Sequence, residues 1–212
     1  MRVEEFIPTH QLKAIKNGTV CCTAPSNIAL VKYWGKKPHQ IPANPSISFT
    51  LNNCKTTTIL KYKVKPSKGL SFEVFLEGKP KEDFKPKIQQ FFERILIYAP
   101  YLETHYFQIE TSNTFPHSSG IASSASGMSA LAMCLVQLER LLYPDSEAAF
   151  LKRKASFLAR LGSGSACRSI EGGLVVWGQH KGISGSSDLQ GLMFSSEVHA
   201  VFQDYQDAIL LV

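Results

Sequence analysis

The fold is organised around one stretch of small residues, 112–127, with the sequence SNTFPHSSGIASSASG. Ten of its sixteen residues are Gly, Ser or Ala, so a ligand can approach the backbone closely. Apolar residues follow at spacings of three and four, which places them on one face of a helix. They are Met128, Leu131, Leu135, Leu138 and Leu142. The sequence therefore predicts a small-residue loop that leads into the N-terminus of a core helix.

Such a loop is suited to binding phosphate. The first N–H groups of a helix have no intrahelical partner, and the helix dipole is positive at that end. Ser123 and Ser124 add hydroxyl groups for a phosphate or for its magnesium ion. The stretch matches neither G-x-x-x-x-G-K-[ST] nor G-x-G-x-x-G. On composition alone, a flexible loop that ends in a serine cap remains an open alternative.

The composition indicates a soluble, globular protein. The 212 residues suffice for one large domain, or for a domain and part of a second. Hydrophobic residues make up 44% and charged residues 19%, and no apolar run approaches the roughly 20 residues needed to span a bilayer. The N-terminus lacks the apolar segment of a secretory signal. Five cysteines without a C-x-x-C pair, and histidines without ligand spacing, predict a cytoplasmic protein with reduced thiols and no structural metal.

The net charge of +6 has three possible explanations: nucleic-acid binding, an anionic small substrate, or solubility. The densest basic tract, Lys61–Lys81, surrounds expected strands and turns and lacks aromatic residues on a common face. A solvated surface is the favoured interpretation, so neither a nucleic-acid nor a membrane partner is expected.

Strands and helices are predicted from hydrophobic periodicity. Strands are expected at 19–24, 26–37 (ending in a turn near Pro38), 46–51, 56–64, 70–75, 105–110, 172–177 and 208–212. Residues 66–69 predict a hairpin between two of these strands, 56–64 and 70–75. Helices are expected at 84–95, up to about Leu142, and after an N-cap at Ser146. Residues 182–191 are expected to form a surface loop. This order favours an α+β fold, with helices packed on one face of a largely antiparallel sheet.

The last five residues, Ala208 to Val212, are apolar and carry no turn or polar tail. Chain termini usually lie at exposed, polar positions. We therefore expect the chain to be the front part of a protein that continues beyond Val212. An edge strand that simply ends at Val212 is the alternative.

A second stretch, 24–36, places Asn27, Lys32 and Lys36 among apolar residues. Polar groups in a buried strand are costly unless something pairs with them. An anionic ligand at the end of the strand would pair with the lysines, and Tyr33 could donate its hydroxyl. Lysines that extend to the surface are the alternative.

A third stretch, 161–173, has two Gly-Ser pairs followed by Arg168. Ser163 and Ser165 can donate to phosphate oxygens, and the Arg168 guanidinium fits a carboxylate or a phosphate bidentately. Cys167 is a nucleophile candidate without a histidine nearby in sequence. A small packed residue is its favoured role.

Together these stretches resemble the diphosphomevalonate decarboxylases, within the superfamily of GHMP kinases. The matching motifs keep the family's order and similar separations over about residues 19–212. They are Ala24-Pro25, Asn27-Ile28-Ala29, Lys32-Tyr33-Trp34-Gly35-Lys36, Asn44-Pro45-Ser46-Ile47-Ser48, Thr50-Leu51, Phe115-Pro116, Gly120-Ile121-Ala122-Ser123-Ser124-Ala125 and Gly162-Ser163-Gly164-Ser165-Ala166-Cys167-Arg168-Ser169.

The resemblance implies a reaction in two parts. ATP phosphorylates the 3-hydroxyl of mevalonate 5-diphosphate, and loss of that phosphate and of carbon dioxide gives isopentenyl diphosphate. It implies that Asn27 and Arg168 orient the carboxylate and the reacting centre, as the catalytic residues. The substrate diphosphate is assigned to Tyr33, Lys36, Ser163 and Ser165. The ATP phosphates are assigned to Ser118, Ser119, Gly120, Ala122, Ser123 and Ser124, with Ser124 near Mg²⁺.

The resemblance also implies a domain plan. Residues 1–16 are a peripheral lead-in, 17–190 a GHMP-kinase N-terminal domain (ribosomal protein S5 domain 2-like) that binds ATP and substrate, and 191–212 the start of a ferredoxin-like domain that is largely missing. The family's general-base aspartate lies in that second half and is expected beyond Val212, so the chain is expected to be inactive alone. The family resemblance further implies a homodimer.

Two other functions stay open. One is a mevalonate-type 3-kinase that does not decarboxylate, and the other is a non-catalytic module that binds a metabolite. Nucleic-acid binding through the basic face is a third, and it would require a steep dependence on salt.

Overall fold

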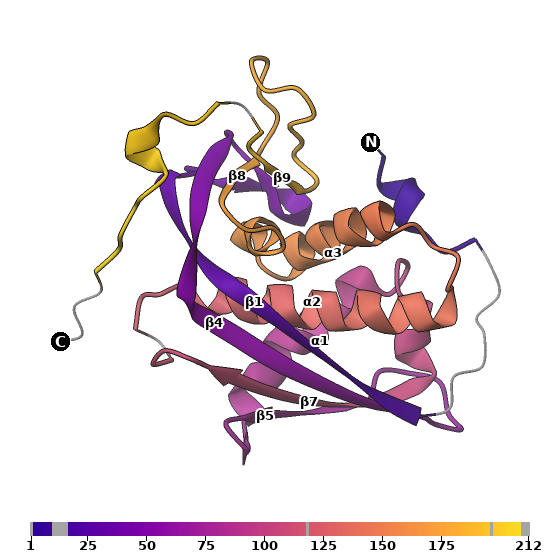
Figure 1. Cartoon of the computed structure of the whole chain (residues 1–212). Coiled ribbons are helices and arrows are strands. Elements are labelled where there is room, and N and C mark those ends of the chain that lie inside the picture. Colours follow the sequence, from indigo (N-terminus) through magenta and orange to yellow (C-terminus); the bar gives the residue numbers. More distant parts are fainter. Residues whose placement is uncertain (1, 10–16, 118, 196, 209–212) are drawn as a thin grey trace.

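The computed structural model describes residues 2–9, 17–117, 119–195 and 197–208. One twisted sheet covers the helices on one side (Figure 1). Its strand order is β6-β5-β7-β4-β8-β9, and β1 pairs with β4. The strands are β1 (Asn17–Val31), β4 (Ser46–Val64), β5 (Phe72–Leu76), β6 (Lys79–Pro80), β7 (His105–Asn113), β8 (Leu174–Trp177) and β9 (Gly191–Met193). A separate two-stranded ribbon joins β2 (Lys36–Lys37) to β3 (Ile41–Pro42).

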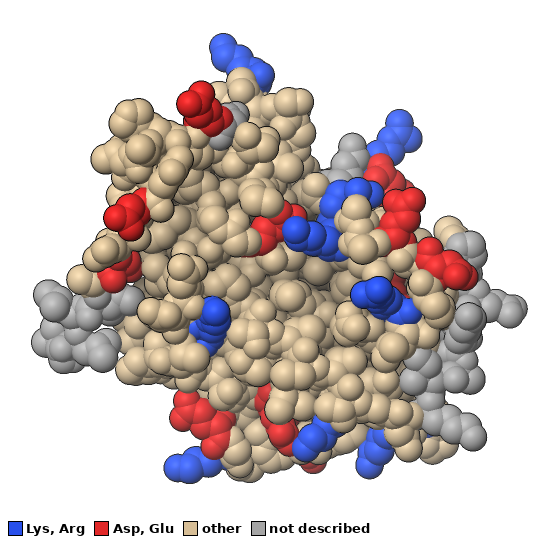
Figure 2. Space-filling model, in the orientation of Figure 1, with Lys and Arg blue, Asp and Glu red and all other residues tan. Residues whose placement is uncertain are grey.

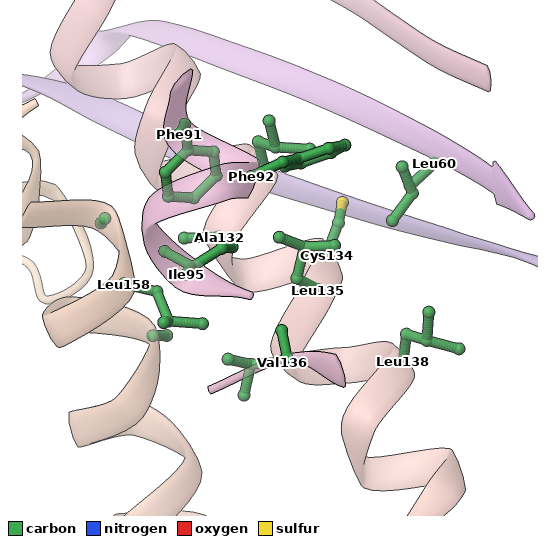
Figure 3. Packing of buried hydrophobic residues seen from close by; sticks show 14 of the residues in the cluster. Leu60, Phe91, Phe92, Ile95, Ala132, Cys134, Leu135, Val136, Leu138 and Leu158 are labelled. Carbon is green, nitrogen blue, oxygen red and sulfur yellow. The ribbon is translucent and has the colours of Figure 1, made fainter. Parts of the chain in front are cut away.

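Three α-helices lie on the inner side of this sheet, with α2 packed against β1 and β4, and α3 packed against α2 and α1. They are α1 (Lys85–Ile95), α2 (Ser123–Leu142) and α3 (Ala148–Gly162). Short 3₁₀ turns occur at η1 (Val3–Phe6), η2 (Pro38–Gln40), η3 (Glu82–Phe84), η4 (Pro100–Glu103), η5 (Gly164–Ser169) and η6 (Ala200–Phe202). The predicted apolar face of α2 is buried as expected, and Leu131, Leu135 and Leu138 join the main core (Figure 3). The helices therefore supply most of the buried residues of the main core.

The two faces of the sheet differ as period-two alternation requires. Leu60 and Phe107 are fully buried against the helices. On the outer face, Lys61 Nζ lies 2.8 Å from Glu110 Oε1, and the Thr23 and Thr57 hydroxyl oxygens lie 2.9 Å apart. The outer face is thus polar, as in an antiparallel sheet that is covered on one side only.

The expected α+β class is confirmed, with a mostly antiparallel sheet and helices on one face. One pair departs from it, because β5 lies parallel to β7. Figure 2 shows Lys and Arg interspersed with Asp and Glu around an uncharged centre on the face that it presents.

The strand predictions need three corrections. The strands predicted at 19–24 and from 26 onwards are one strand, β1, with a register shift after Pro25. Pro25 is tolerated because β1 lies at an edge of the sheet. The strands predicted at 46–51 and 56–64 are likewise one strand, β4.

The third correction concerns the predicted hairpin between 56–64 and 70–75, which is wrong. β7 lies between β4 and β5. The N–H groups of Lys65 and Gly69 donate to the carbonyls of Thr104 and Glu103, at 3.1 Å each, so the intervening loop is tied to the start of β7.

The predicted cap of α3 is also wrong. Ser146 does not cap this helix, because the N-cap is Glu147 and no side chain makes a capping hydrogen bond there. Residues 191–193, expected to begin a second domain, belong to the main sheet as β9.

The predicted last strand, Ala208 to Val212, has no structural outcome. Val212 and the three residues before it lie outside the described residues, and Ala208, which is described, is not in a strand. The general-base aspartate expected beyond Val212 likewise has no counterpart in the described part of the chain and stays a prediction.

Candidate functional site

An apolar pocket opens between α1, α2 and the inner face of the sheet. Its volume is about 150 Å³. The inner wall is apolar, and its lining includes Val74, Leu76, Ile88, Ile109, Met128 and Leu131. The polar residues of the lining are Thr56, Thr58, Thr111 and Asn113 of the sheet, together with Asp83, Lys87, His117, Ser123 and Ser124. This lining fits a ligand with a flat apolar part against the wall and a polar part at the start of α2.

The small-residue loop is shaped by backbone conformation. Gly120 has φ +81° and Ala122, the N-cap of α2, has φ +54°. A left-handed Ala is strained, and such strain is held by the surrounding structure. The Ser26 hydroxyl donates to the carbonyl of Ile121 and so fixes the loop to β1. The Ser119 hydroxyl donates to the Pro116 carbonyl at 2.6 Å.

The start of α2 matches the predicted anion site. No side chain caps this helix, so its first N–H groups stay available to a ligand. Ser123 and Ser124 are the first two residues of α2, not part of the loop before it. Both line the pocket, which joins the expected phosphate ligands to the apolar cavity. Ser118 lies outside the described residues.

A second group of residues surrounds Arg168 in η5. Arg168 is only 3% exposed. Its Nη1 donates to Ser46 Oγ at 2.6 Å, and Ser46 Oγ donates in turn to the Trp177 carbonyl at 3.2 Å. The guanidinium carbon lies 5.7 Å from the centre of the Tyr33 ring and 5.9 Å from that of Trp177. Burial lowers the pKa of Arg168, although Cys167 and Tyr33 act in the other direction.

The Arg168 guanidinium is held but not neutralised. Its buried Nε has no hydrogen-bond partner. Among the described residues, no carboxylate hydrogen-bonds to Arg168, Asn27 or Ser46. A buried charge without a partner is destabilising, so this arrangement favours an anionic ligand.

Asn27 is positioned from β1 by η5. Its Nδ2 donates to Ser169 Oγ at 2.7 Å and to the Ser165 carbonyl at 3.2 Å. Its Oδ1 is buried without a partner. These bonds join segments about 140 residues apart in sequence and bring the two predicted catalytic residues, Asn27 and Arg168, to the same 3₁₀ turn.

The predicted diphosphate ligands lie beside this group. Lys36 Nζ is 5.8 Å from the centre of the Tyr33 ring and donates to Gln40 Oε1 at 2.8 Å. A Cβ at Gly164 would lie 2.6 Å from the Trp177 ring and 3.4 Å from Lys36 Cδ. Only glycine therefore fits there without displacing the buried Trp177. The flanking Ser163 and Ser165 are half-buried.

Two basic residues near Lys36, namely Lys87 and Arg94, were missed by the sequence analysis. Burial lowers the pKa of Lys36, and the charge of Arg94 lowers it further. Burial and the charge of Lys36 lower the pKa of Lys87. Lys87 also lines the pocket, so positive charges extend from Lys36 to the apolar cavity. Because an amphipathic helix normally exposes its lysines, no sequence signal distinguished Lys87 from the other lysines of α1.

Ser46 was also missed as a functional residue, although it stands in a motif that carries the resemblance. Lys32, Trp34 and Lys36 are exposed, and the expected buried strand ends at Val31. The alternative interpretation, lysines that extend to the surface, therefore describes both Lys32 and Lys36.

Cys167 is a packed residue and not a nucleophile. It is fully buried, its Sγ donates to the Gly164 carbonyl at 3.1 Å, and burial raises its pKa to about 12. In the described parts of the chain, no group of three or more His, Cys, Asp or Glu residues is arranged to hold a metal ion. Nor does any helix among them have the length and hydropathy to cross a bilayer.

Comparison with known proteins gives consistent matches. Residues 24–189 match the model of the diphosphomevalonate decarboxylase-like N-terminal domain. Diphosphomevalonate decarboxylase mvd1 of Aspergillus fumigatus is 35% identical over 180 residues, covering 79% of this chain and 43% of the relative. The chain therefore spans about half the length of the curated relatives that it matches.

Solved structures agree. Mevalonate diphosphate decarboxylase from Staphylococcus aureus superposes with a TM-score of 0.64 at 34% identity, covering 82% of this chain and 49% of that one. A complex of a protein named MDDEF with MVAPP, AMPPCP and magnesium has a TM-score of 0.63 at 33% identity, with coverages of 82% and 49%.

Proposed function

The chain belongs to the diphosphomevalonate decarboxylase-like family, and from that premise we propose that it forms the ATP- and substrate-binding part of a diphosphomevalonate decarboxylase. Its proposed reaction is the ATP-dependent decarboxylation of mevalonate 5-diphosphate to isopentenyl diphosphate. The observation that carries the proposal is Arg168, a buried guanidinium held by Ser46 between two aromatic rings, without a carboxylate partner among the described residues.

The substrate carboxylate is the anion that we assign to Arg168. The bond from Nη1 to Ser46 and the Tyr33 and Trp177 rings hold the guanidinium, and its Nε stays free to donate, so a carboxylate meets a preset orientation. Asn27, whose Oδ1 has no partner, would orient the reacting centre beside it. Because the donors are already fixed, little reorganisation is needed when charge moves.

The substrate diphosphate is assigned to Tyr33, Lys36, Ser163 and Ser165. Lys87 and Arg94 are added to this group, because the charge of Arg94 lowers the pKa of Lys36 and the charge of Lys36 lowers the pKa of Lys87. The lowered pKa values of the two lysines follow from burial and from repulsion by these neighbouring charges, and a bound diphosphate would relieve that repulsion.

ATP is assigned to the pocket and the start of α2. The apolar wall suits the adenine ring, and the uncapped N–H groups suit its phosphates. Gly120 and Ala122 set the shape of the loop, Ser119 braces it, and Ser118 and Ser123 are the remaining proposed contacts. We place Mg²⁺ near the Ser124 hydroxyl. The solved relative in complex with AMPPCP and magnesium supports the proposal that the chain binds a nucleotide with magnesium.

Nucleotide binding can be tested on the 212-residue chain itself. Calorimetric titration with ATP should show binding that magnesium strengthens. Ser124→Ala should reduce the magnesium-dependent gain and leave magnesium-free ATP binding unchanged, whereas the exposed Ser67→Ala should change neither. Equal binding by both variants with magnesium would remove Ser124 from the metal site.

The proposed domain boundaries and oligomeric state follow from the family. Residues 17–190 are proposed as the binding domain and 1–16 as a lead-in. Because β9 (Gly191–Met193) completes the sheet of that domain, only the residues after Met193 are proposed as the start of a second domain, with the general-base aspartate beyond Val212. A homodimer in the cytoplasm is the proposed state. Light scattering on the product of the complete reading frame tests the dimer, and a monomer at micromolar concentration would contradict it.

A further inference from the structure

Two cysteines of the core face one another across the sheet–helix interface. Cys22 lies in β1 and Cys134 in α2. The alternation of β1 turns Cys22 towards the helices together with the buried Val20 and Ala24, whereas its neighbour Cys21 is exposed on the opposite face. Cys134 is fully buried, while Cys22 is partly exposed.

The contact between them is defined by the strand pairing. Cys22 lies opposite Thr58 in the β1–β4 register, and Cys134 Sγ donates to the Thr58 carbonyl at 3.2 Å. Cys22 also packs against the core cluster that contains Cys134. Figure 3 shows the Cys134 sulfur pointing from α2 towards the strands. Both cysteines therefore lie beside Thr58, at the same part of the interface.

The two thiols have different reactivities. The neighbouring Cys134 thiol lowers the pKa of Cys22, and burial opposes this only in part. The neighbouring Cys22 and burial raise the pKa of Cys134. Thiolate character and access both favour attack by Cys22, with Cys134 as the second thiol.

We propose that Cys22 and Cys134 form a reversible disulfide when the protein meets a low-molecular-weight disulfide such as glutathione disulfide. The Cys22 thiolate attacks one glutathione sulfur and forms a mixed disulfide, releasing one glutathione thiolate. Cys134 then loses its proton and attacks the Cys22 sulfur, and the second glutathione leaves. Two protein thiols are oxidised, one glutathione disulfide is reduced, and two protons pass to the released glutathiones.

The bond joins the two elements that carry the halves of the candidate site. β1 carries Asn27 five residues after Cys22, and α2 begins at Ser123. Oxidation would thus link the strand that supplies Asn27 to the helix that begins at the phosphate loop. The inference does not depend on the proposed function, because it concerns only these two thiols.

The test is native oxidation of the chain by glutathione disulfide, followed by alkylation, digestion and mass spectrometry. We expect a Cys22–Cys134 peptide and an intact mass lower by two hydrogens, without retained glutathione. The thermal midpoint should rise on oxidation and return with dithiothreitol. Persistent glutathione on Cys22 of the unsubstituted chain, or a link that uses Cys21 or Cys54, would overturn the proposal.

Three variants sharpen the result. Cys134→Ala should trap glutathione on Cys22, because the second thiol is absent. Cys22→Ala should leave Cys134 unmodified, because it is buried, and this variant changes only a partly exposed side chain. Cys21→Ser, the matched control on the opposite face, should form the disulfide as before. Loss of the disulfide in Cys21→Ser, or glutathione on Cys134 in Cys22→Ala, would contradict the assignment.

Discussion

The start of α2 and the surroundings of Arg168 are two differently built parts of one candidate site. At α2 the ligand groups are backbone N–H groups and exposed hydroxyls, and two left-handed residues shape the loop. Around Arg168 they are buried side chains, fixed by hydrogen bonds between Ser46, Asn27 and η5. The start of α2 is therefore an open site of backbone N–H groups, whereas the side chains around Arg168 are held in place before a ligand binds.

The difference indicates that the two parts respond differently to substitution. A cradle of N–H groups tolerates a phosphate chain that enters and leaves, and single side-chain changes there should have small effects. A buried guanidinium has little freedom, and its loss leaves nothing to replace it. Variants around Arg168 should therefore have larger effects than variants at α2.

The largest effect is expected for Arg168→Lys in the product of the complete reading frame. Lysine keeps the charge but loses the planar fork and the bond to Ser46. Truncating a buried, hydrogen-bonded charge costs about 2–5 kcal/mol, so kcat/KM should fall by roughly a hundredfold or more. Steady-state kinetics measure it, with the exposed Arg153→Lys as control. Equal kcat/KM for Arg168→Lys and Arg153→Lys would contradict the larger effect expected around Arg168.

Ser46→Ala should have the next largest effect. It removes the acceptor of the Arg168 Nη1 bond. A buried donor left without a partner costs about 1–3 kcal/mol, so a fall in kcat/KM of roughly ten- to a hundredfold is expected. Ser46→Thr keeps the hydroxyl and should restore most of the activity. If Ser46→Ala lowered the thermal stability but left kcat and KM unchanged, the role of Ser46 would be structural only.

Lys87→Met should lower the affinity for ATP by roughly tenfold, because a positive charge on the lining of the proposed nucleotide pocket is lost. The exposed Lys68→Met is the matched control, and it should change the affinity by less than about twofold. Calorimetry at low and high salt measures both. If Lys68→Met weakened binding as much as Lys87→Met, the charge would act at long range and not at the site.

The smallest effect is proton uptake on binding. The pKa values of Lys36 and Lys87 are lowered in the free protein, and a nearby anion raises the pKa of each towards its usual value. Protons should therefore be taken up at pH values between the lowered pKa values and the usual lysine pKa. Uptake should vanish at pH well below the lowered pKa values, where both lysines are charged with or without a ligand. Titration in buffers of different ionisation enthalpy measures this. Proton release on binding would contradict the assigned anion site.

Local features of both parts could be predicted from the sequence. The α2 helix follows from the spacing of Met128, Leu131 and Leu135, and the small-residue loop follows from composition. Asn27 and Arg168 were identified through their motifs, although their roles remain proposals.

Non-local features could not be predicted. The place of β7 between β4 and β5 depends on pairing between distant segments, and the turn chemistry of 66–69 pointed to a hairpin instead. The bond between Ser46 and Arg168 spans more than a hundred residues. Lys87 resembled a solvated helix residue, because its pattern carries no information about the neighbouring Lys36.

The most direct measurement uses the product of the complete reading frame with mevalonate 5-diphosphate, ATP and magnesium, and follows ADP and carbon dioxide separately. We predict that both form in equal amounts, and that the 212-residue chain alone forms neither, because no carboxylate among the described residues hydrogen-bonds to Asn27, Arg168 or Ser46 as a base. ADP without carbon dioxide would contradict decarboxylation and indicate a 3-kinase. Neither product from the complete protein would leave a metabolite-binding module.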